Sequence, residues 1–312
     1  MYLSTTVDDI MVACADLKQV EEFKRLLSKK HGGPFQVSDL GEPNRLLGMG
    51  VRRDRAKREI YLSHSVYIHG AYDEYSQYLE TYFGDKPMPK TPSDVNEIKE
   101  LLSGKFEAET PNKMEAMEKL PFRQLVGKLW YHCCNLRPEA CYTMSVLSRS
   151  LTTYTQKHFK IALHLLRWLK TQAEVPYVLG RRTGRTAGNW LYCYVDADFA
   201  NCAETRRSNT GYLIFLDGSL IAFVSKRQSG VALSTTDAEV RAATAACKEI
   251  LWVVRLIDEL GFAQKQPVDV MEDNSATVTL SQSSGAQHSG RIKYMSIRDK
   301  FCLNLAQDGV VR

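Results

Sequence analysis

Three acidic residues in the second half of the chain stand where expected strands end or an expected helix begins. Asp196 closes an apolar, β-branched stretch, Glu239 lies in the first turns of a helical stretch, and Asp273 follows another apolar stretch. Each acid alone is explained as a turn residue or as a partner of a helix dipole. Together they could hold Mg²⁺, which prefers carboxylate oxygens, and two such ions can clamp the reacting oxygens of a phosphodiester.

The stretches around these acids follow the order strand, strand, strand, helix, strand, helix. Side-chain alternation and helical spacing predict these elements. The expected strands are 190–195, 210–216, 220–225 and 268–272, and the expected helices are 235–260, 275–282 and 294–307. Ser234 with Asp237, or Thr236 with Glu239, can cap the long helix, and Gly261 follows its end. This order can bring the three acids together.

Three motifs in this region, YVDADFA, RRSNTGYLIFLDGSLIAFVSKRQSGVALSTTDAEVRAATAACKEILWVVRLIDELG and VMEDNSATVTL, resemble the ribonuclease H domain of copia-type retrotransposon polyproteins. The resemblance implies an α/β fold over 189–312, a ribonuclease H-like mixed sheet with flanking helices. It also implies hydrolysis of the RNA strand of an RNA–DNA hybrid by two Mg²⁺ ions, for which Mn²⁺ can substitute. Asp196, Glu239 and Asp273 match the catalytic, metal-binding acids of that family.

The fourth acid of the family is missing from its expected position. Members of the family commonly read KHIDIRYHF near the last helix, whereas this chain reads KYMSIRDKF, with Ser296 in place of the acid. Asp299 lies one helical turn on, about 5 Å along the axis, and is a candidate substitute ligand. Its alternative role is an ion pair with Lys293 or Lys300 in solvent. We therefore expect either weakened hydrolysis or an inactive retroelement product that at most binds nucleic acid.

The resemblance extends upstream. LPFRQLVGKLWYHCCNLRPEACYTMSVLSRS and HFKIALHLLRWLK resemble the segment that links polymerase to ribonuclease H, and TTVDDIMVA with SDLGEPNRLLGM resembles the end of the reverse transcriptase palm. This implies a truncated α+β palm remnant at 1–82, a linker at 83–119, a helical connecting segment at 120–180 and the ribonuclease H-like domain at 189–312.

Asp8 and Asp9 match the paired acids of a polymerase active site. Polymerase chemistry also needs a metal-binding acid from an earlier palm strand and the fingers that hold the nucleotide. Only seven residues precede Asp8, so we expect a polymerase relic and no DNA synthesis by this chain alone. The apolar stretches on either side of these acids predict two short strands within 1–15.

The remaining elements upstream follow from helical spacing and turn residues. The pattern weakens from 82 to 119, where four prolines stand among polar residues. The expected elements are a helix at 17–30, a hairpin at 38–64 with a charged tip at 52–59, and helices at 121–150, interrupted at Arg137–Pro138, and at 156–171.

The charge distribution separates the two halves of the 312-residue chain. The net charge is +5, and residues 189–312 carry 13 basic against 14 acidic side chains, so the excess lies in the first 188 residues. A basic surface could bind a nucleic acid, with simple solubility as the alternative. Arg206, Arg207 and Lys226 are candidate contacts to the backbone of an RNA–DNA hybrid, and exposed, solvated charges are the commoner explanation for such residues.

The composition excludes several classes of protein. With 44% hydrophobic and 25% charged residues, the chain has the composition of a globular protein and not of a disordered or collagen-like one. No apolar run is long enough to cross a membrane. Eight cysteines without a CxxC pair argue against a zinc ribbon or a disulfide scaffold. We expect an intracellular location, cytoplasmic or nuclear, and no membrane partner.

Overall fold

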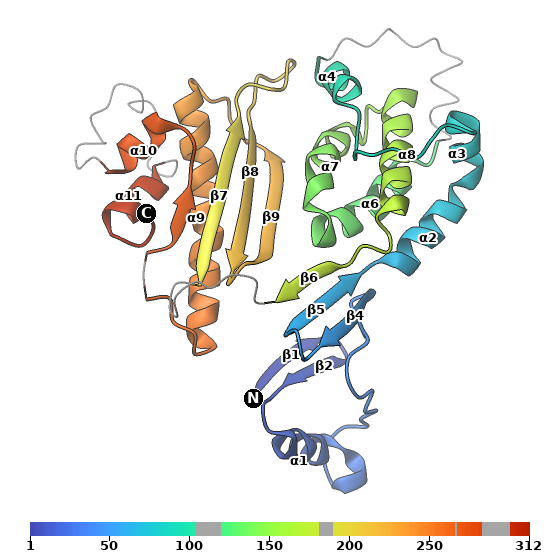
Figure 1. The fold of residues 1–312 in the computed structure, drawn as a ribbon, viewed down its shortest axis with the longest axis vertical. Coiled ribbons are helices and arrows are strands. Elements are labelled where there is room, and N and C mark those ends of the chain that lie inside the picture. The colour runs from blue at the N-terminus through green and yellow to red at the C-terminus, as the bar shows by residue number, and fades with distance from the viewer. Residues whose placement is uncertain (104–119, 181–189, 266, 283–299) are drawn as a thin grey trace. The chain divides into compact units, whose positions relative to one another are not determined.

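A computed structural model of the chain describes residues 1–103, 120–180, 190–265, 267–282 and 300–312 (Figure 1). The structure is mixed α/β, which confirms the predicted fold class at that level. It divides into two compact units, Met1–Arg52 and Arg53–Arg312. No helix in the described ranges is long and apolar enough to cross a membrane.

The first unit has no core of its own, because none of residues 1–52, all of them described, is buried. Its elements are β1 (Tyr2–Thr6), β2 (Asp9–Ala13), α1 (Leu17–Leu27), a 3-10 turn (Lys29–His31), β3 (Arg45–Leu46) and β4 (Met49–Asp54), which ends just past the unit. The pairing of Thr6 with Asp9 leaves Val7 and Asp8 in the turn, where Val7 has a φ of 52°. The predicted pair of short strands is thereby confirmed.

The first part of the second unit is mainly helical. Its elements are β5 (Glu59–Ser63), α2 (Ser65–Glu74), α3 (Ser76–Phe83), α4 (Val95–Ser103), α6 (Phe122–Leu136), a 3-10 turn (Pro138–Ala140), α7 (Cys141–Leu147), a second turn (Ser148–Ser150), α8 (Gln156–Thr171) and β6 (Tyr177–Gly180). Apolar side chains of α6 and α8 form the core, with Phe122, Leu129 and Phe159 all 0% exposed. Burying each contributes roughly 1.5–3 kcal/mol. The predicted break at Arg137–Pro138 is present between α6 and α7.

Two elements of this part differ from the sequence-based expectation. Helix α4 lies inside the predicted linker, and its Ile98, Leu101 and Leu102 are buried in the core. The prolines before it marked a break in the pattern but not the end of the folded region. Strand β6 closes the segment expected to be helical, and it pairs antiparallel with β5, with Tyr61 opposite Val178.

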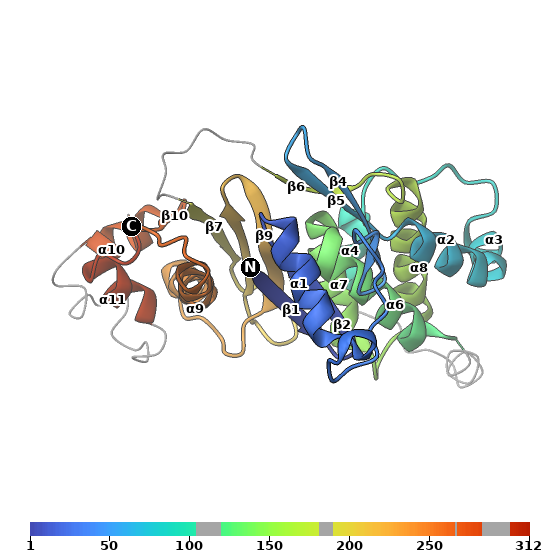
Figure 2. The same cartoon turned by 90° about the horizontal axis from the view of Figure 1, so that it is seen from below.

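The second part of this unit is a four-stranded sheet of order β10-β7-β8-β9. Its elements are β7 (Leu191–Asp198), β8 (Asn209–Leu216), β9 (Ser219–Arg227), α9 (Thr235–Glu259), β10 (Asp269–Met271), α10 (Ser275–Gln282) and α11 (Phe301–Gln307). β7, β8 and β9 are antiparallel neighbours, whereas β10 runs parallel to β7. Figure 2 views α9 end-on beside the sheet, where its alanine-rich face meets β7 and β8. These bounds agree closely with the predicted strands and helices.

The C-terminal residues pair with the chain around β10. Residues Val310 and Arg312 exchange backbone hydrogen bonds with Val268 and Val270, so they border β10. The predicted helix at 294–307 is described from Phe301 onward, and its earlier residues lie outside the described ranges.

Candidate metal centre

Asp196, Glu239 and Asp273 converge in the structure. One carboxylate oxygen from each lies within 4.8 Å of the others. Within the described ranges, no other group of three His, Cys, Asp or Glu residues has ligand atoms this close together. Three separate elements supply them: β7, the second turn of α9, and the residues that follow β10.

The register of the sheet brings two of these acids together. Alternate residues of β7 are buried against α9, and Asp196 is on the exposed side of that alternation. Parallel pairing places Met271 opposite Tyr194, two residues before Asp196, so the chain leaves β10 beside the end of β7. Asp273 therefore arrives next to Asp196.

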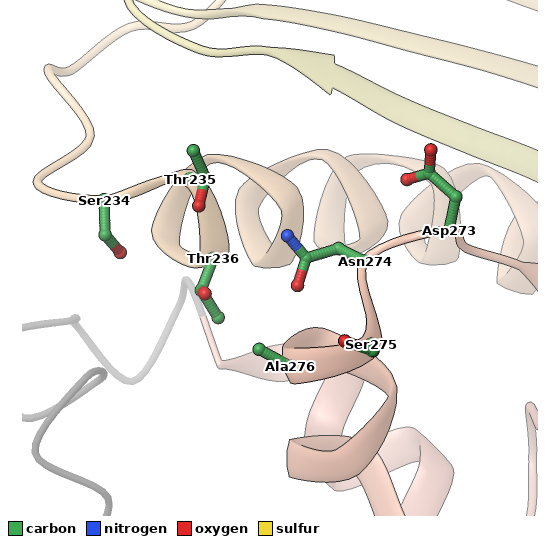
Figure 3. Close-up of a pocket in the computed structure, with 7 residues that line it drawn as sticks. All are labelled: Ser234, Thr235, Thr236, Asp273, Asn274, Ser275 and Ala276. Carbon is green, nitrogen blue, oxygen red and sulfur yellow. The ribbon is translucent and has the colours of Figure 1, made fainter.

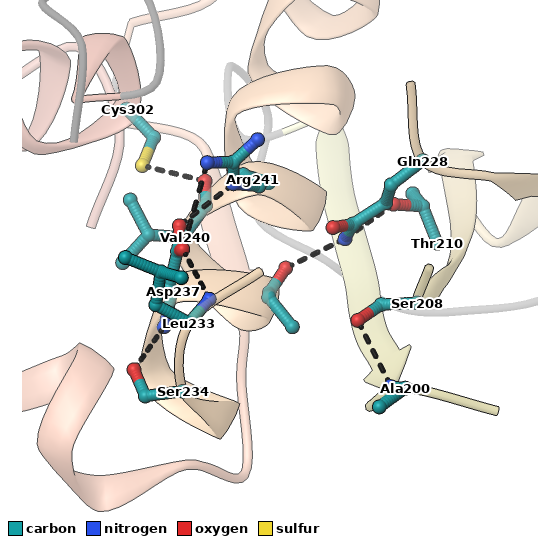
Figure 4. Close-up of polar contacts among 11 residues, drawn as sticks. Ala200, Ser208, Thr210, Gln228, Leu233, Ser234, Asp237, Val240, Arg241 and Cys302 are labelled. Carbon is teal, nitrogen blue, oxygen red and sulfur yellow. Dashed lines mark hydrogen bonds and ion pairs between the residues drawn. The ribbon is translucent and has the colours of Figure 1, made fainter. Parts of the chain in front are cut away.

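A network of polar contacts fixes the first turns of α9, which carry Glu239 (Figure 4). The hydroxyl of Ser234 accepts the N–H of Asp237 at 3.1 Å, and the carboxylate of Asp237 accepts the N–H of Leu233 at 2.8 Å. Arg241, one turn on, donates to the same carboxylate at 2.7 Å. The capping by Ser234 with Asp237 is as predicted.

The backbone carbonyls on either side of Glu239, those of Ala238 and Val240, both accept hydrogen bonds from side chains outside the helix. The buried amide of Gln228 donates to the hydroxyl of Thr210 at 3.1 Å and to the carbonyl of Ala238 at 2.9 Å. On the other side, the thiol of Cys302 donates to the carbonyl of Val240 at 3.5 Å. The helix start is thus tied to β8 and to α11, which limits the positions open to the Glu239 side chain.

The electrostatics of the site favour a cation. Glu239 is 6% exposed, and burial, together with the charges of Glu272, Asp196 and Asp273, raises its pKa to about 8. A hydrogen bond from the Ala197 backbone opposes this shift. The Oε2 atom of Glu239 has no hydrogen-bond partner among the described residues. A divalent cation would supply the missing partner and relieve the repulsion.

Glu272 is a fourth carboxylate near the site that the sequence did not single out. Burial, above all, raises its pKa to about 7, and its Oε2 atom also lacks a partner among the described residues. Its Oε1 atom accepts the N–H of Asn274 at 2.9 Å. The acidic pair Glu272–Asp273 was visible in the sequence, but the burial of Glu272 depends on the tertiary structure.

The donor set of the three acids consists of carboxylate oxygens only. Hard cations such as Mg²⁺, Mn²⁺ and Ca²⁺ take oxygen ligands, whereas Zn²⁺ sites usually include His or Cys. The triad could therefore hold a metal ion, and its chemistry is that of a hard divalent cation.

A pocket adjoins the triad on the side of Asp273 (Figure 3). It has a volume of about 660 Å³ and lies between the first residues of α9 and α10. Its lining is mostly polar: Ser234, Thr235, Thr236, Asp273, Asn274, Ser275 and Ala276. Hydroxyl and amide groups at two helix starts can donate hydrogen bonds to an anionic ligand.

The other predicted site residues are placed as follows. Asp8 and Asp9 are exposed, at the β1–β2 turn of the first unit. Arg206 and Arg207 precede β8, and Lys226 pairs with Thr210 near the end of β9. Because Asp196 pairs with Gly211, all three basic residues lie at the same end of the sheet as Asp196. Ser296 and Asp299 lie outside the described residues.

No protein-family model matches the chain. The chain is 32% identical over 302 residues to the retrovirus-related Pol polyprotein from transposon TNT 1-94 of Nicotiana tabacum. The aligned residues make up 97% of the chain and 21% of the polyprotein. The chain is 27% identical over 312 residues to the retrovirus-related Pol polyprotein from transposon RE1 of Arabidopsis thaliana. The alignment includes 100% of the chain and 19% of that polyprotein. The chain therefore spans about a fifth of the length of these relatives.

A shorter relative matches part of the chain. Secreted RxLR effector protein 161 of Plasmopara viticola is 34% identical over 137 residues, which is 44% of the chain and 94% of that protein. The similarity to the Pol polyproteins extends over almost the whole chain, so it accounts for more of the sequence.

Proposed function

Because the chain belongs to the Pol polyproteins of copia-type retrotransposons, we propose that residues 189–312 are a ribonuclease H-like domain that hydrolyses the RNA strand of RNA–DNA hybrids with Mg²⁺. The observation that carries the proposal is the meeting of Asp196, Glu239 and Asp273 from three separate elements within 4.8 Å. Their order in the chain and their places on strand, helix and strand end support a common site for phosphodiester hydrolysis.

In this proposal the three acids hold the metal, with Mn²⁺ as a substitute. Two bound divalent ions would supply the positive charge that activates water and stabilises the leaving oxygen. With its pKa raised to about 8, Glu239 would have to give up a proton near neutral pH for a cation to bind. Metal affinity should therefore rise with pH.

The proposed partner is an RNA–DNA hybrid. Arg206, Arg207 and Lys226 lie at the Asp196 end of the sheet and could pair with phosphates. The polar pocket beside Asp273 offers hydroxyl and amide donors to the sugar–phosphate backbone. Hybrids would be selected through the 2′-hydroxyl groups of one strand.

A cleavage assay tests the proposal. A labelled RNA–DNA hybrid is incubated with the full chain and Mg²⁺ or Mn²⁺, and fragments are separated by electrophoresis. We expect cleavage of the RNA strand that Asp196→Asn and Glu239→Gln abolish. Glu259→Gln is the matched control, because this exposed acid stands at the far end of the same helix, and it should leave cleavage unchanged.

The same assay separates the two expectations about the fourth acid. Ser296→Asp should raise cleavage if an acid at that position completes the second metal site. If the wild type cleaves no better than Asp196→Asn in either metal, the hydrolytic proposal fails. Hybrid binding without cleavage would then support the alternative, an inactive retroelement product that binds nucleic acid.

A further inference from the structure

The face of the sheet that carries Asp196 also carries a row of polar residues that leads to the edge strand β9. Asp198, two residues after Asp196 on β7, lies opposite Asn209 of β8. Asn209 in turn lies opposite Arg227 of β9. Residues opposite each other on paired strands, like residues two apart on one strand, have side chains on the same face of a sheet. Arg227 therefore belongs to the face of the acidic triad.

The helical segment before the sheet brings a second arginine to this row. Arg149 lies in the turn Ser148–Ser150 that follows α7. Its Nη2 atom donates to the side-chain oxygen of Asn209 at 2.9 Å, and its Nε atom donates to the carbonyl of Ser145 at 3.1 Å. Arg149 and Arg227 are thus both neighbours of Asn209, at the end of the sheet where Asp196 lies.

The two positive charges are not neutralised within the described part of the chain. Both arginines are partly buried, and neither forms an ion pair with a described residue. Asp198, the acid of the same row, accepts a hydrogen bond from the amide of Asn201. Burial and the charge of Arg227 lower the pKa of Arg149. Two partly buried guanidinium groups side by side are unfavourable unless an anion binds to them.

The anion that this arrangement fits is a phosphate diester. The planar guanidinium group presents donors that match two phosphate oxygens. The hydrogen bonds of Arg149 to Asn209 and Ser145 hold its side chain in place beforehand, so less side-chain entropy is lost when a ligand binds.

The distance from the acids to the arginines suits a nucleic acid. Neighbouring strands of a sheet lie about 4.8 Å apart, so the row from Asp198 across to Arg227 spans about 10 Å. The phosphates of one nucleic-acid strand repeat about every 3.4 Å along the helix axis. A backbone whose cleaved phosphate lies at Asp196 can therefore place another phosphate, a few nucleotides away, at the arginines.

We propose that Arg149 and Arg227 form a phosphate-binding site that holds the backbone of the RNA–DNA hybrid a few nucleotides from the cleaved phosphate. The identity of the partner rests on the proposed function, whereas phosphate binding itself needs no metal ion. Lys226, next to Arg227, lies on the opposite face of the sheet by strand alternation and is not part of this site. The site gives the helical segment a part in substrate binding.

Hybrid binding by the full chain in EDTA tests the proposal, because metal-dependent cleavage is then excluded. Fluorescence anisotropy gives the association constant at several salt concentrations, and the salt slope is the slope of its logarithm against that of the salt concentration. We expect Arg149→Gln and Arg227→Gln each to lower the association constant about fivefold to tenfold at 0.1 M salt and to reduce the salt slope by about 0.7–0.9. Arg255→Gln, the matched control, removes the same charge from an exposed turn near the end of α9 and should bind as the wild type does.

A charge-conserving variant separates phosphate binding from simple docking of the helical segment. Arg149→Lys keeps the positive charge but loses the forked donors, so it should keep most of the salt slope that Arg149→Gln loses. Circular dichroism checks that each variant is folded. If Arg149→Gln does not fold, Arg227→Gln on the edge strand decides.

The outcomes are distinct from those of the cleavage assay. If the wild type cleaves the hybrid but Arg149→Gln and Arg227→Gln bind it with the affinity and salt slope of Arg255→Gln, the phosphate site is refuted and the hydrolytic proposal stands. If both glutamine variants weaken binding but the wild type does not cleave, the phosphate site stands without hydrolysis. A wild type that does not bind the hybrid refutes the phosphate site.

Discussion

Glu239 is the residue at which burial and charge conflict most strongly. It is 6% exposed, lies among three other carboxylates, and has one carboxylate oxygen without a partner among the described residues. A buried carboxylate of this kind costs stability unless it is protonated or bound to a cation. A metal ion held by Asp196, Glu239 and Asp273 could remove this conflict.

The identity of the three acids could be predicted from the sequence, whereas Glu272 could not. Asp196, Glu239 and Asp273 occupy element ends in motifs that have a family resemblance. Glu272 sits one residue before Asp273, and only the packed structure shows its carboxyl group to be partly buried. Local patterns give the chemical type of a residue, but burial arises from distant parts of the chain.

The buried pair of His64 and His132 predicts that the folded protein loses stability in acid. The Nδ1 atoms of His64 and His132 lie 2.8 Å apart, and burial lowers their pKa values to about 4 and about 3 from the ordinary 6.5. Below pH 6.5 the unfolded chain binds protons that the folded protein does not. As far as these two histidines determine it, the free energy of unfolding is therefore highest above pH 6.5. It falls as the pH drops toward 4, by up to about 1.4 kcal/mol per pH unit for each histidine.

Urea unfolding at several pH values checks this prediction. His132→Gln removes one titrating group while keeping a polar partner for His64. The slope of the free energy of unfolding against pH, between pH 6 and 4.5, should therefore decrease by about 1.4 kcal/mol per pH unit, the contribution of one proton. Between pH 7 and 8, where both histidines are neutral, wild type and variant should have parallel curves. An unchanged slope below pH 6 would contradict the prediction.

At the scale of elements, long patterns were predictable and short ones were not. β7 and α9 were expected within a few residues of their bounds, because alternation and helical spacing extend over many positions. β6 has four residues and gains its stability from pairing with β5, so no local pattern marks it. α4 was hidden by the prolines that precede it, although its apolar spacing is regular.

Helix α4 gives a prediction that distinguishes a packed helix from a linker. Ile98 is 4% exposed and Val95 is 65% exposed on the same helix. Ile98→Ala should lower the free energy of unfolding by about 2–4 kcal/mol, because it leaves a cavity in the core. Val95→Ala, the matched control, should change it by less than about 0.5 kcal/mol. Chemical denaturation followed by circular dichroism measures both, and equal small effects would indicate a linker.

At the scale of the whole molecule, charge and burial are unevenly distributed. The basic excess lies in the first 188 residues, while the acidic triad lies in the rest. The first unit has no buried residue, whereas the second contains two separate hydrophobic cores. Length and composition predicted a globular chain, but they did not show that its first 52 residues lack a core.

The proposed hybrid binding predicts a strong dependence on salt. The logarithm of the association constant should fall linearly with the logarithm of salt concentration, by about 0.7–0.9 per neutralised phosphate. Replacing Arg206 and Arg207 by alanine should reduce this slope by up to about 2. Arg255→Ala, on an exposed turn near the end of α9, is the control. Fluorescence anisotropy with a labelled hybrid measures the slope, and salt-independent binding would contradict the proposal.

The parallel pairing of β10 with β7 has a consequence for the order of folding. β7, β8 and β9 follow one another as hairpins, so Asp196 is placed by contacts close in sequence. Asp273 reaches its neighbours only when β10 pairs with β7, as in the pairing of Asp269 with Tyr192. The two strands are neighbours in the sheet, but β8, β9 and α9 lie between them in the sequence. Such distant closure is slow, because chain entropy is lost before contacts compensate for it. We therefore expect the three acids, which could hold a metal ion, to come together late in folding, when the sheet is complete.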